Sequence, residues 1–392
     1  MKRALMCFAV SVLFSPICFA KDDVIVHFES GEHIAAGSEI TIHLSKDDPG
    51  QANYTFHLPN GVQLTYGEML SMGDFYGIPG KPTSLEKTES DRENHFRDIF
   101  KTLATDYHTV IEAPQILAVI HEEQSAVDEG LKKGEKPETI YRQISDHLNR
   151  EWNAITGGSG TGPLWYLDEG RYLKLAAADI DHFGQYALLA YQAGHQVALQ
   201  EALNARLKND THELELAYAM NAFACHYLSD LFASGHLRSP RYELYSMVTP
   251  STVGSLLVTY MHDEEDQYGL HVHDQQNHRW ISYGDRFYFD PQSAENRVRQ
   301  KIALQTSADE IFSAYETGVI PVDQVTSFIP EPDENGSDSQ NDISPLFYYD
   351  QTSHKLMRRV DMTNVYDRHW TSNWWGITTL AELREQRGGV GL

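Results

Sequence analysis

The sequence predicts a mainly α protein, in which a large helical domain carries a small β-rich lobe at its N-terminal side and an extension at its C-terminal end. Three observations predict this class. Amphipathic helical patterns follow one another from residue 94 to about residue 156. Stretches rich in Ala, Leu and Tyr over 171–203 and 214–236 are typical of helices buried in a bundle. The clearest strand-like alternation is confined to residues 24–59.

The beginning of the chain has the pattern of a secretory signal peptide over residues 1–20. Lys2 and Arg3 precede an apolar run that ends at the small residue Ala20, where we expect cleavage. No later segment is apolar over the length of a membrane span, so we expect a soluble, secreted protein. Cys225 is the single cysteine left after cleavage, which excludes an intramolecular disulfide. A metal cluster could supply folding free energy instead.

The composition is strongly acidic, with a formal net charge of −25 over 392 residues. Such a surface repels phosphodiester polymers unless a local basic groove compensates. No run of Lys and Arg with interleaved aromatic residues is present. We therefore expect no nucleic-acid partner, and nothing in the sequence indicates an obligate protein partner.

The predicted domains follow in order along the chain. Residues 21–60 form the predicted β-rich lobe, because apolar and polar residues alternate there in three short segments: 24–30, 39–45 and 53–59. The helical domain covers residues 61–325. Residues 326–392 comprise an acidic linker rich in Pro, Gly and Ser and then a tail with three tryptophans, which we expect to pack on the domain.

The stretch from Ala222 to Arg241 contains the spacing H-x3-D-x5-H, formed by His226, Asp230 and His236. On a helix His226 and Asp230 lie one turn apart on the same face, surrounded by apolar residues. A buried imidazole and carboxylate need a partner, and zinc accepts both nitrogen and carboxylate oxygen. The alternative is a hydrogen-bonded His–Asp pair without a metal.

A second pair of the same kind strengthens the metal interpretation. His262 is followed one turn later by Asp266, with Glu265 as an alternative acid, and two such pairs in one chain favour a polynuclear site. Asp74 follows Gly73 at the end of a predicted helix over 64–72, where a turn aspartate bonded to its own backbone is the alternative. Further acids and a histidine cluster before a long predicted helix: Asp179, Asp181 and His182.

These residues and their surroundings resemble the superfamily of zinc-dependent phospholipases C and single-strand zinc nucleases. The resemblance is closest to the secreted Gram-negative phospholipases C that hydrolyse phosphatidylcholine, and it covers roughly residues 64–288. It is carried by four segments: LTYGEMLSMGDFYGIP, DIDHFGQYALLAYQAGH, SDLFASGHLRSPR and MHDEEDQYGL.

The resemblance implies a helical domain with two or three zinc ions in a cleft. One ion would be held by Asp74, His182, His226 and Asp230, and another by His236, His262 and Asp266. Asp168, Asp179 and Asp181 compete with Asp74, and Glu265 competes with Asp266. In the superfamily a third ion uses Asp230's counterpart, the mature N-terminal tryptophan amine and a nearby histidine. This chain has Lys21, Asp22 and Asp23 there instead, which puts the third ion in doubt and leaves His57 as one candidate ligand.

The activity that the resemblance implies is that of a secreted zinc phospholipase C, with phospholipid membranes as substrate. It would hydrolyse the glycerol-side phosphodiester of phosphatidylcholine-like lipids to diacylglycerol and a phosphorylated headgroup. Two residues would act catalytically: Asp74 as proton acceptor and Arg238 by holding a phosphate oxygen. A zinc nuclease or phosphomonoesterase with the same cluster is the alternative enzyme. A binding protein in which metal has only a structural role is the alternative from a different class.

Overall fold

The computed structural model describes residues 29–162, 165–334 and 339–387. With 61% of the chain in helices and 9% in strands, the prediction of a mainly α protein with small β elements is confirmed. The predicted signal peptide and residues 24–28 of the first predicted strand lie outside the described residues. Within the described ranges, no helix combines the length and the apolar character that crossing a membrane requires.

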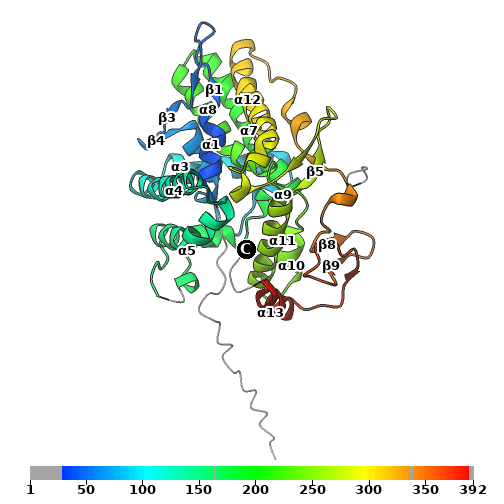
Figure 1. Cartoon of the computed structure of the whole chain (residues 1–392). Coiled ribbons are helices and arrows are strands. Elements are labelled where there is room, and N and C mark those ends of the chain that lie inside the picture. Colours follow the sequence, from blue (N-terminus) through cyan, green and yellow to red (C-terminus); the bar gives the residue numbers. More distant parts are fainter. Residues whose placement is uncertain (1–28, 163–164, 335–338, 388–392) are drawn as a thin grey trace, which may run out of the picture.

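The centre of the molecule is a bundle formed by α7 (Gly184–Lys208), α8 (Thr211–Asp230) and α12 (Ala294–Thr317), with α3 (Glu89–Ala104) against α7 (Figure 1). Many of the residues at the helix contacts are alanines with almost no exposed surface, which lets the helix backbones approach closely. Asn209 ends α7 in the left-handed region with φ 51°, and Asp210 caps α8 by accepting from the His212 amide. A tight turn therefore folds α8 back along α7.

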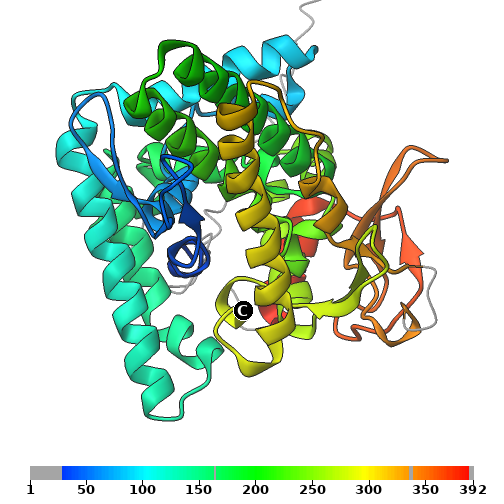
Figure 2. The ribbon, with the colours of Figure 1, turned by 90° about the horizontal axis from the view of Figure 1, so that it is seen from above.

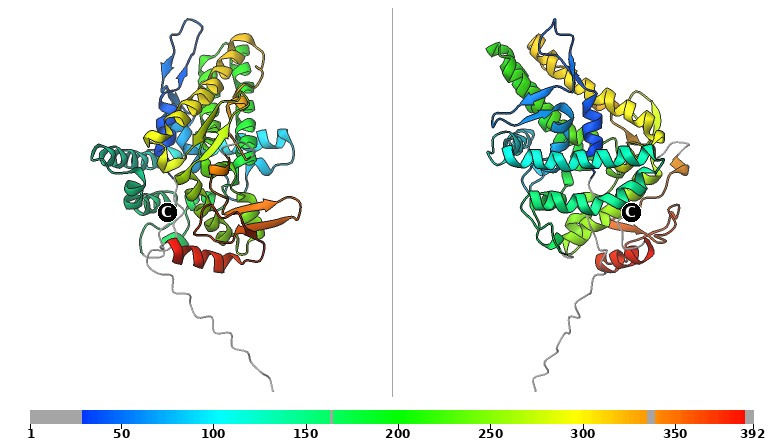
Figure 3. Two further views of the ribbon diagram at one scale, coloured as in Figure 1. Left: turned by 45° about the vertical axis from the view of Figure 1, so that its right-hand side comes forward. Right: turned by 60° about the vertical axis from the view of Figure 1, so that its left-hand side comes forward.

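A second layer is the antiparallel pair of α4 (Thr109–Lys132) and α5 (Pro137–Ile155), which lie side by side in Figure 3. Pro137 occupies the first turn of α5, where its missing N–H leaves no hydrogen bond of the helix unmade. Trp152 of α5 is fully buried against Phe75 and Tyr172. This aromatic contact joins the pair to the short helix α6 (Arg171–Ala176) and to the turn that carries Asp74.

The N-terminal region contains two small antiparallel hairpins, as the alternation predicts, but also a helix that the alternation does not predict. The hairpins pair β1 (Thr41–Ile42) with β2 (Gln51–Ala52), and β3 (Thr55–His57) with β4 (Gln63–Thr65). Helix α1 (Gly31–Ser38) precedes them, and α2 (Tyr66–Ser71) follows, begun by a capping box between Thr65 and Glu68. Apolar side chains of this region, including Ile34 and Ile40, belong to the main core.

The C-terminal half surrounds α11 (Ser251–Tyr268). A hairpin follows α11, formed by β5 (Leu270–His273) and β6 (Arg279–Ser282), and β7 (Glu331–Pro332) extends it on the other side of β5. In Figure 2 α12 runs between the α4 side of the molecule and the C-terminal strands. The remaining elements are α9 (Ser234–Leu237), α10 (Arg241–Met247), β8 (Phe347–Asp350), β9 (Lys355–Arg359), β10 (Trp370–Thr371) and α13 (Gly376–Arg387).

The C-terminal extension packs on α10 and α11 through a second apolar core. This core includes Leu346, Leu356 and Leu380 of the extension and Leu257 and Met261 of α11. The tryptophans of the tail divide between packing and exposure. Trp374 lies against Phe347 with tilted rings and donates its indole N–H to the Leu356 carbonyl at 3.0 Å, whereas Trp375 is 78% exposed.

Candidate metal centre

The last turn of α8 places His226 and Asp230 on one buried face, as their spacing predicts. His226 is 0% exposed and its Nε2 lies 3.5 Å from Asp230 Oδ2. Its Nδ1 is 3.0 Å from the Leu70 carbonyl, which can only accept, so Nδ1 donates the proton. In the neutral ring Nε2 therefore carries a lone pair that points toward the Asp230 carboxylate. A histidine that binds a metal has this arrangement, with one nitrogen hydrogen-bonded and the other able to coordinate.

Two short turns bring further ligand types to the same point. His182 ends a 3₁₀ turn (Ile180–His182), and its Nδ1 lies 2.9 Å from Asp230 Oδ2 and 3.1 Å from His226 Nε2. Asp74 ends another 3₁₀ turn (Met72–Asp74), with Oδ1 at 3.4 Å from His226 Nε2. The structure thus brings together the residues that the resemblance assigns to one ion. They are called the first group below: Asp74, His182, His226 and Asp230.

Gly73 allows the turn that carries Asp74 to reach α8. A Cβ atom at this position would overlap the imidazole of His226. The absence of a side chain therefore brings Asp74 within reach of that imidazole, and a larger residue would force the turn away from the helix.

The competing acids are engaged elsewhere. Asp168 is exposed. The carboxylate of Asp179 pairs with Arg241, and that of Asp181 accepts the backbone N–H groups of Thr83 and Ser84. Asp74 is consequently the acid that the geometry favours for the first group.

A second group forms between α9, α11 and a turn that the sequence analysis did not single out. His262 Nε2 lies 2.9 Å from Asp285 Oδ2, and His236 Nε2 lies 3.7 Å from the same oxygen. The other nitrogens are held in place, since His236 Nδ1 contacts the His182 carbonyl at 2.7 Å and His262 Nδ1 contacts Asp263 at 3.0 Å. The second group comprises His236, His262, Asp266 and Asp285.

Asp266 lies closer to this group than its competitor Glu265. Asp266 Oδ2 is 3.2 Å from His262 Nε2 and accepts no hydrogen bond, although it is buried. Its Oδ1 accepts from the Gly235 amide at 2.6 Å. Glu265 instead forms an ion pair with Arg238.

That ion pair leaves no support for Arg238 as a phosphate ligand. Its Nε lies 2.6 Å from Glu265, and a terminal nitrogen donates to the Ile343 carbonyl at 2.8 Å. The guanidinium is thus directed at the segment that leads into the C-terminal extension. The predicted catalytic role would require both of these contacts to break.

His33 also belongs to this centre, although the strand-like sequence pattern of the N-terminal region did not indicate it. It lies on α1, and its ring centroid is 4.4 Å from that of His226. Its Nε2 is 3.6 Å from Asp230 Oδ1, and burial lowers its pKa to about 4, so the ring is neutral at neutral pH. His57, the candidate named from the sequence, instead pairs with Glu215, and its side chain is 53% exposed.

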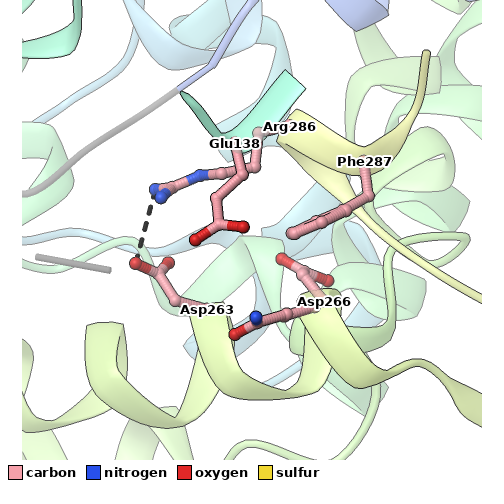
Figure 4. A pocket seen from close by; sticks show the side chains of 6 residues that line it. Glu138, Asp263, Asp266, Arg286 and Phe287 are labelled. Atoms are coloured by element: carbon pink, nitrogen blue, oxygen red, sulfur yellow. Dashed lines mark hydrogen bonds and ion pairs between the residues drawn. The ribbon is translucent and has the colours of Figure 1, made fainter. Parts of the chain in front are cut away.

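The whole centre is rich in negative charge. Seven carboxylates lie in or beside it, all of them buried except the partly buried Asp285: Glu29, Glu32, Asp74, Glu123, Asp230, Asp266 and Asp285. Arg286 lies 3.3 Å from Glu29 and reaches Asp263 at the same distance, beside a small hollow lined by Glu138 and Phe287 (Figure 4). One arginine cannot balance this charge, so the centre favours binding of cations.

The same excess of negative charge acts on the histidines and on the buried acids. Burial opposes a charge on His226 and His236, yet neighbouring carboxylates raise the pKa of each to about 9. Burial raises the pKa of Glu29 to about 8 and that of Glu123 to about 7. In the metal-free protein, bound protons would have to neutralise the negative charge that metal cations would otherwise neutralise.

Two hollows reach the centre and share Asp179 in their walls. One is lined by His236, His262 and Asp285 together with the apolar side chains of Phe183 and Val258. The other touches His182 beside Gly73, Tyr76 and Tyr227. Each group therefore contributes at least one side chain to the wall of a hollow.

The donor set fits zinc, because it combines imidazole nitrogens with carboxylate oxygens, and because the buried Oδ2 atoms of Asp230 and Asp266 accept no hydrogen bond. Comparisons of the chain with known protein families, with curated proteins and with solved structures find no match. The assignment of a metal centre therefore depends on the geometry of these side chains.

Proposed function

We propose that this protein is a secreted zinc-dependent phospholipase C, which hydrolyses the glycerol-side phosphodiester of phosphatidylcholine-like lipids. One observation carries the proposal: imidazoles and carboxylates far apart in the sequence converge into two adjacent groups beside hollows. The choice of lipid over nucleic acid rests on the acidic composition and on the sequence resemblance. Bound zinc would supply Lewis-acid polarisation of the phosphate and a more reactive nucleophile from water.

The residues of the chain orient the ligand atoms before any ion binds. His226 and His236 each direct one ring nitrogen to a backbone carbonyl, of Leu70 and His182 respectively, and so present the other nitrogen to the centre. Asp74 is oriented in a similar way, because its Oδ2 accepts from the Ser30 hydroxyl at 3.0 Å. Its Oδ1 then faces the centre, where it can bind metal or accept a proton.

The hollow beside the second group is suited to part of an ester with both polar and apolar character. Phe183 lies against His236 with ring centroids 4.6 Å apart, and Val258 adds to the apolar wall. Thr259 and Ser255 line the same hollow, and their hydroxyl groups donate to the backbone carbonyls of Ser255 and Ala177 respectively. These walls can position a lipid phosphodiester and limit the access of bulk water.

The test is an assay of diacylglycerol release from phosphatidylcholine vesicles by the purified protein, with and without a strong chelator. We expect release that is lost on chelation and restored by zinc. Cleavage of single-stranded DNA or of phosphomonoesters without release of diacylglycerol would identify the alternative enzyme. Inertness toward all of these esters, with metal bound, would leave a structural role for the ions and contradict the proposal.

A further inference from the structure

The two adjacent tryptophans of the C-terminal extension have different surroundings. Trp374 packs against the second apolar core, whereas the side chain of Trp375 is 78% exposed. Trp375 contributes to the start of α13 through its carbonyl, which accepts from the Thr379 amide and the Thr378 hydroxyl. Any residue supplies a carbonyl, so these hydrogen bonds do not require a tryptophan at this position.

Trp375 belongs to a patch of exposed apolar side chains that come from two elements. Ile377, at the start of α13, is 53% exposed, and Met247, at the end of α10, is 48% exposed. Gly376 lies so close to Val248 that a Cβ atom on the glycine would overlap the valine side chain. This contact brings the neighbours of both residues together, and they are called the apolar patch below: Met247, Trp375 and Ile377.

The apolar patch lies where two segments without charge meet. Residues 244–261 and 370–381 contain no Asp, Glu, Lys or Arg, although these residues make up 22% of the chain. The two segments lie side by side because α13 packs against α11 (Figure 1). Their exposed polar side chains carry hydroxyl and amide groups and include Ser246, Thr249, Thr252, Ser372 and Asn373. These segments therefore form an uncharged surface on a strongly acidic protein.

This combination of side chains suits the surface of a phospholipid bilayer. Tryptophan is enriched at membrane–water interfaces, because its ring is largely apolar while its N–H group is polar. Methionine and isoleucine gain free energy in proportion to the apolar area that they remove from water. A charged side chain would have to be desolvated on the same approach, and an acidic one would be repelled by lipid phosphates. The two uncharged segments avoid both costs.

The apolar patch is also close to the hollow beside the second group. Val253 contacts Gly376, and Ser255 belongs to the wall of the hollow, so one turn of α11 reaches both. A bilayer held at the patch would therefore lie within about 10 Å of that wall, which is the diameter of a helix.

We propose that the apolar patch docks the protein reversibly on the surface of a zwitterionic phospholipid bilayer. The choice of a lipid surface over a protein as the occupant rests on the proposed function. The three side chains enter the interfacial region, and the uncharged segments face the headgroups. Since the chain has a formal net charge of −25, anionic lipid should weaken this binding, and binding to phosphatidylcholine should depend little on salt.

The test measures how the full-length, zinc-loaded protein sediments with vesicles of a phosphonate analogue of phosphatidylcholine. In this lipid a methylene group replaces the glycerol oxygen on phosphorus, so binding is measured without hydrolysis. Trp375→Ala should lower the partition coefficient roughly tenfold, and Trp375→Asp should reduce binding to the background. The matched control is Leu207→Asp, which changes an 84% exposed apolar residue between Arg206 and Lys208 and should bind like the parent.

Hydrolysis supplies the second readout. On phosphatidylcholine vesicles Trp375→Asp should release diacylglycerol roughly tenfold more slowly than the parent. On a short-chain phosphatidylcholine dissolved as monomers both proteins should have the same kcat/KM, because no surface has to be bound first. Trp375→Asp should also melt at the same temperature as the parent, since the side chain that it changes is exposed.

The outcomes separate this inference from the proposed function. Vesicle binding by Trp375→Asp equal to that of the parent would overturn the inference, whether or not the protein hydrolyses lipid. Binding that depends on Trp375, in a protein that cleaves no phosphate ester, would support the docking surface and contradict the proposed function. Dimers that Trp375→Asp dissociates, in a protein that binds no vesicles, would assign the patch to a second copy of the chain and overturn the inference.

Discussion

The two groups of the centre are built in different ways. In the first group His226 and Asp230 share the last turn of a fully buried helix, and two short turns add His182 and Asp74. The second group draws on the short helix α9, on α11 and on the turn that begins with Asp285. The first group is thus fixed by the bundle, whereas the second depends on how separate elements dock.

The docking of the second group involves the C-terminal extension. Arg359 of β9 is 0% exposed and places its guanidinium on Glu264 of α11, with contacts at 2.7 Å and 2.9 Å. Arg387 of α13 contacts the same carboxylate. These ion pairs hold the helix that carries His262 and Asp266, so the extension stabilises one group and has no comparable contact with the other among the described residues.

The largest expected effect is at His226. In His226→Ala the first group loses its central ligand, so turnover should fall on the order of 10³-fold or more, corresponding to several kcal/mol of lost metal assistance. Metal analysis should show an ion missing from the first group while the second group remains loaded. A variant that keeps full activity would contradict the assignment of the first group.

Next in size is the effect at Asp285. Asp285→Asn removes the carboxylate shared by His236 and His262, so the affinity of the second group for zinc should fall by at least about 10–100-fold. Zinc titration with a competing chelator measures this change. Asp98→Asn, at an exposed acid on α3, is the control and should titrate like the parent. Equal affinities in the two variants would exclude Asp285 from the centre.

A smaller effect on metal affinity, together with a clear effect on stability, is expected at Arg359. Arg359→Ala leaves Glu264 buried with one cationic partner fewer, which should cost roughly 3–5 kcal/mol of unfolding free energy. Denaturant unfolding measures this cost, and zinc titration should show weaker binding by the second group than by the first.

The adjacent Arg358 provides the control for Arg359. It pairs with Glu382, whose side chain is 51% exposed, so Arg358→Ala should change stability by less than about 1 kcal/mol. If Arg359→Ala lowered the zinc affinity of both groups equally, the result would contradict the claim that the C-terminal extension stabilises only the second group.

The smallest effect is expected at His57. His57→Ala removes a half-exposed imidazole that pairs with Glu215, and it should alter stability by less than about 1 kcal/mol. Metal content should stay the same as in the parent. A lost ion would place His57 in the centre and contradict the role given to His33.

Local spacing explains which parts of the centre the sequence could predict. His226 with Asp230 and His262 with Asp266 lie one helical turn apart, and helical periodicity alone places each pair on one face. The helical bundle was predictable for the same reason. The residues from other elements that join each pair are set by tertiary docking. The spacing of residues in the sequence carries no information about this docking.

The residues that were missed lie on elements without a strong periodic pattern. Residues 31–38 fold as a helix because they pack against α2 and the main core, although the flanking segments alternate like strands, so the sequence pattern does not indicate His33 or Glu32. Asp285 had a usable signal. It follows Gly284 and precedes aromatic residues, as Asp74 follows Gly73 and precedes Phe75.

The contact of Gly73 with the His226 ring has a consequence for sequence variation. The backbone of Gly73, and not a side chain, packs directly against the imidazole of His226. Because glycine has no side chain to shorten, substitutions of neighbouring residues cannot make this contact looser from the glycine side. A saturation library at this codon should therefore return glycine almost exclusively. Active descendants of this chain should accordingly diverge over most of their surface and keep this one smallest residue.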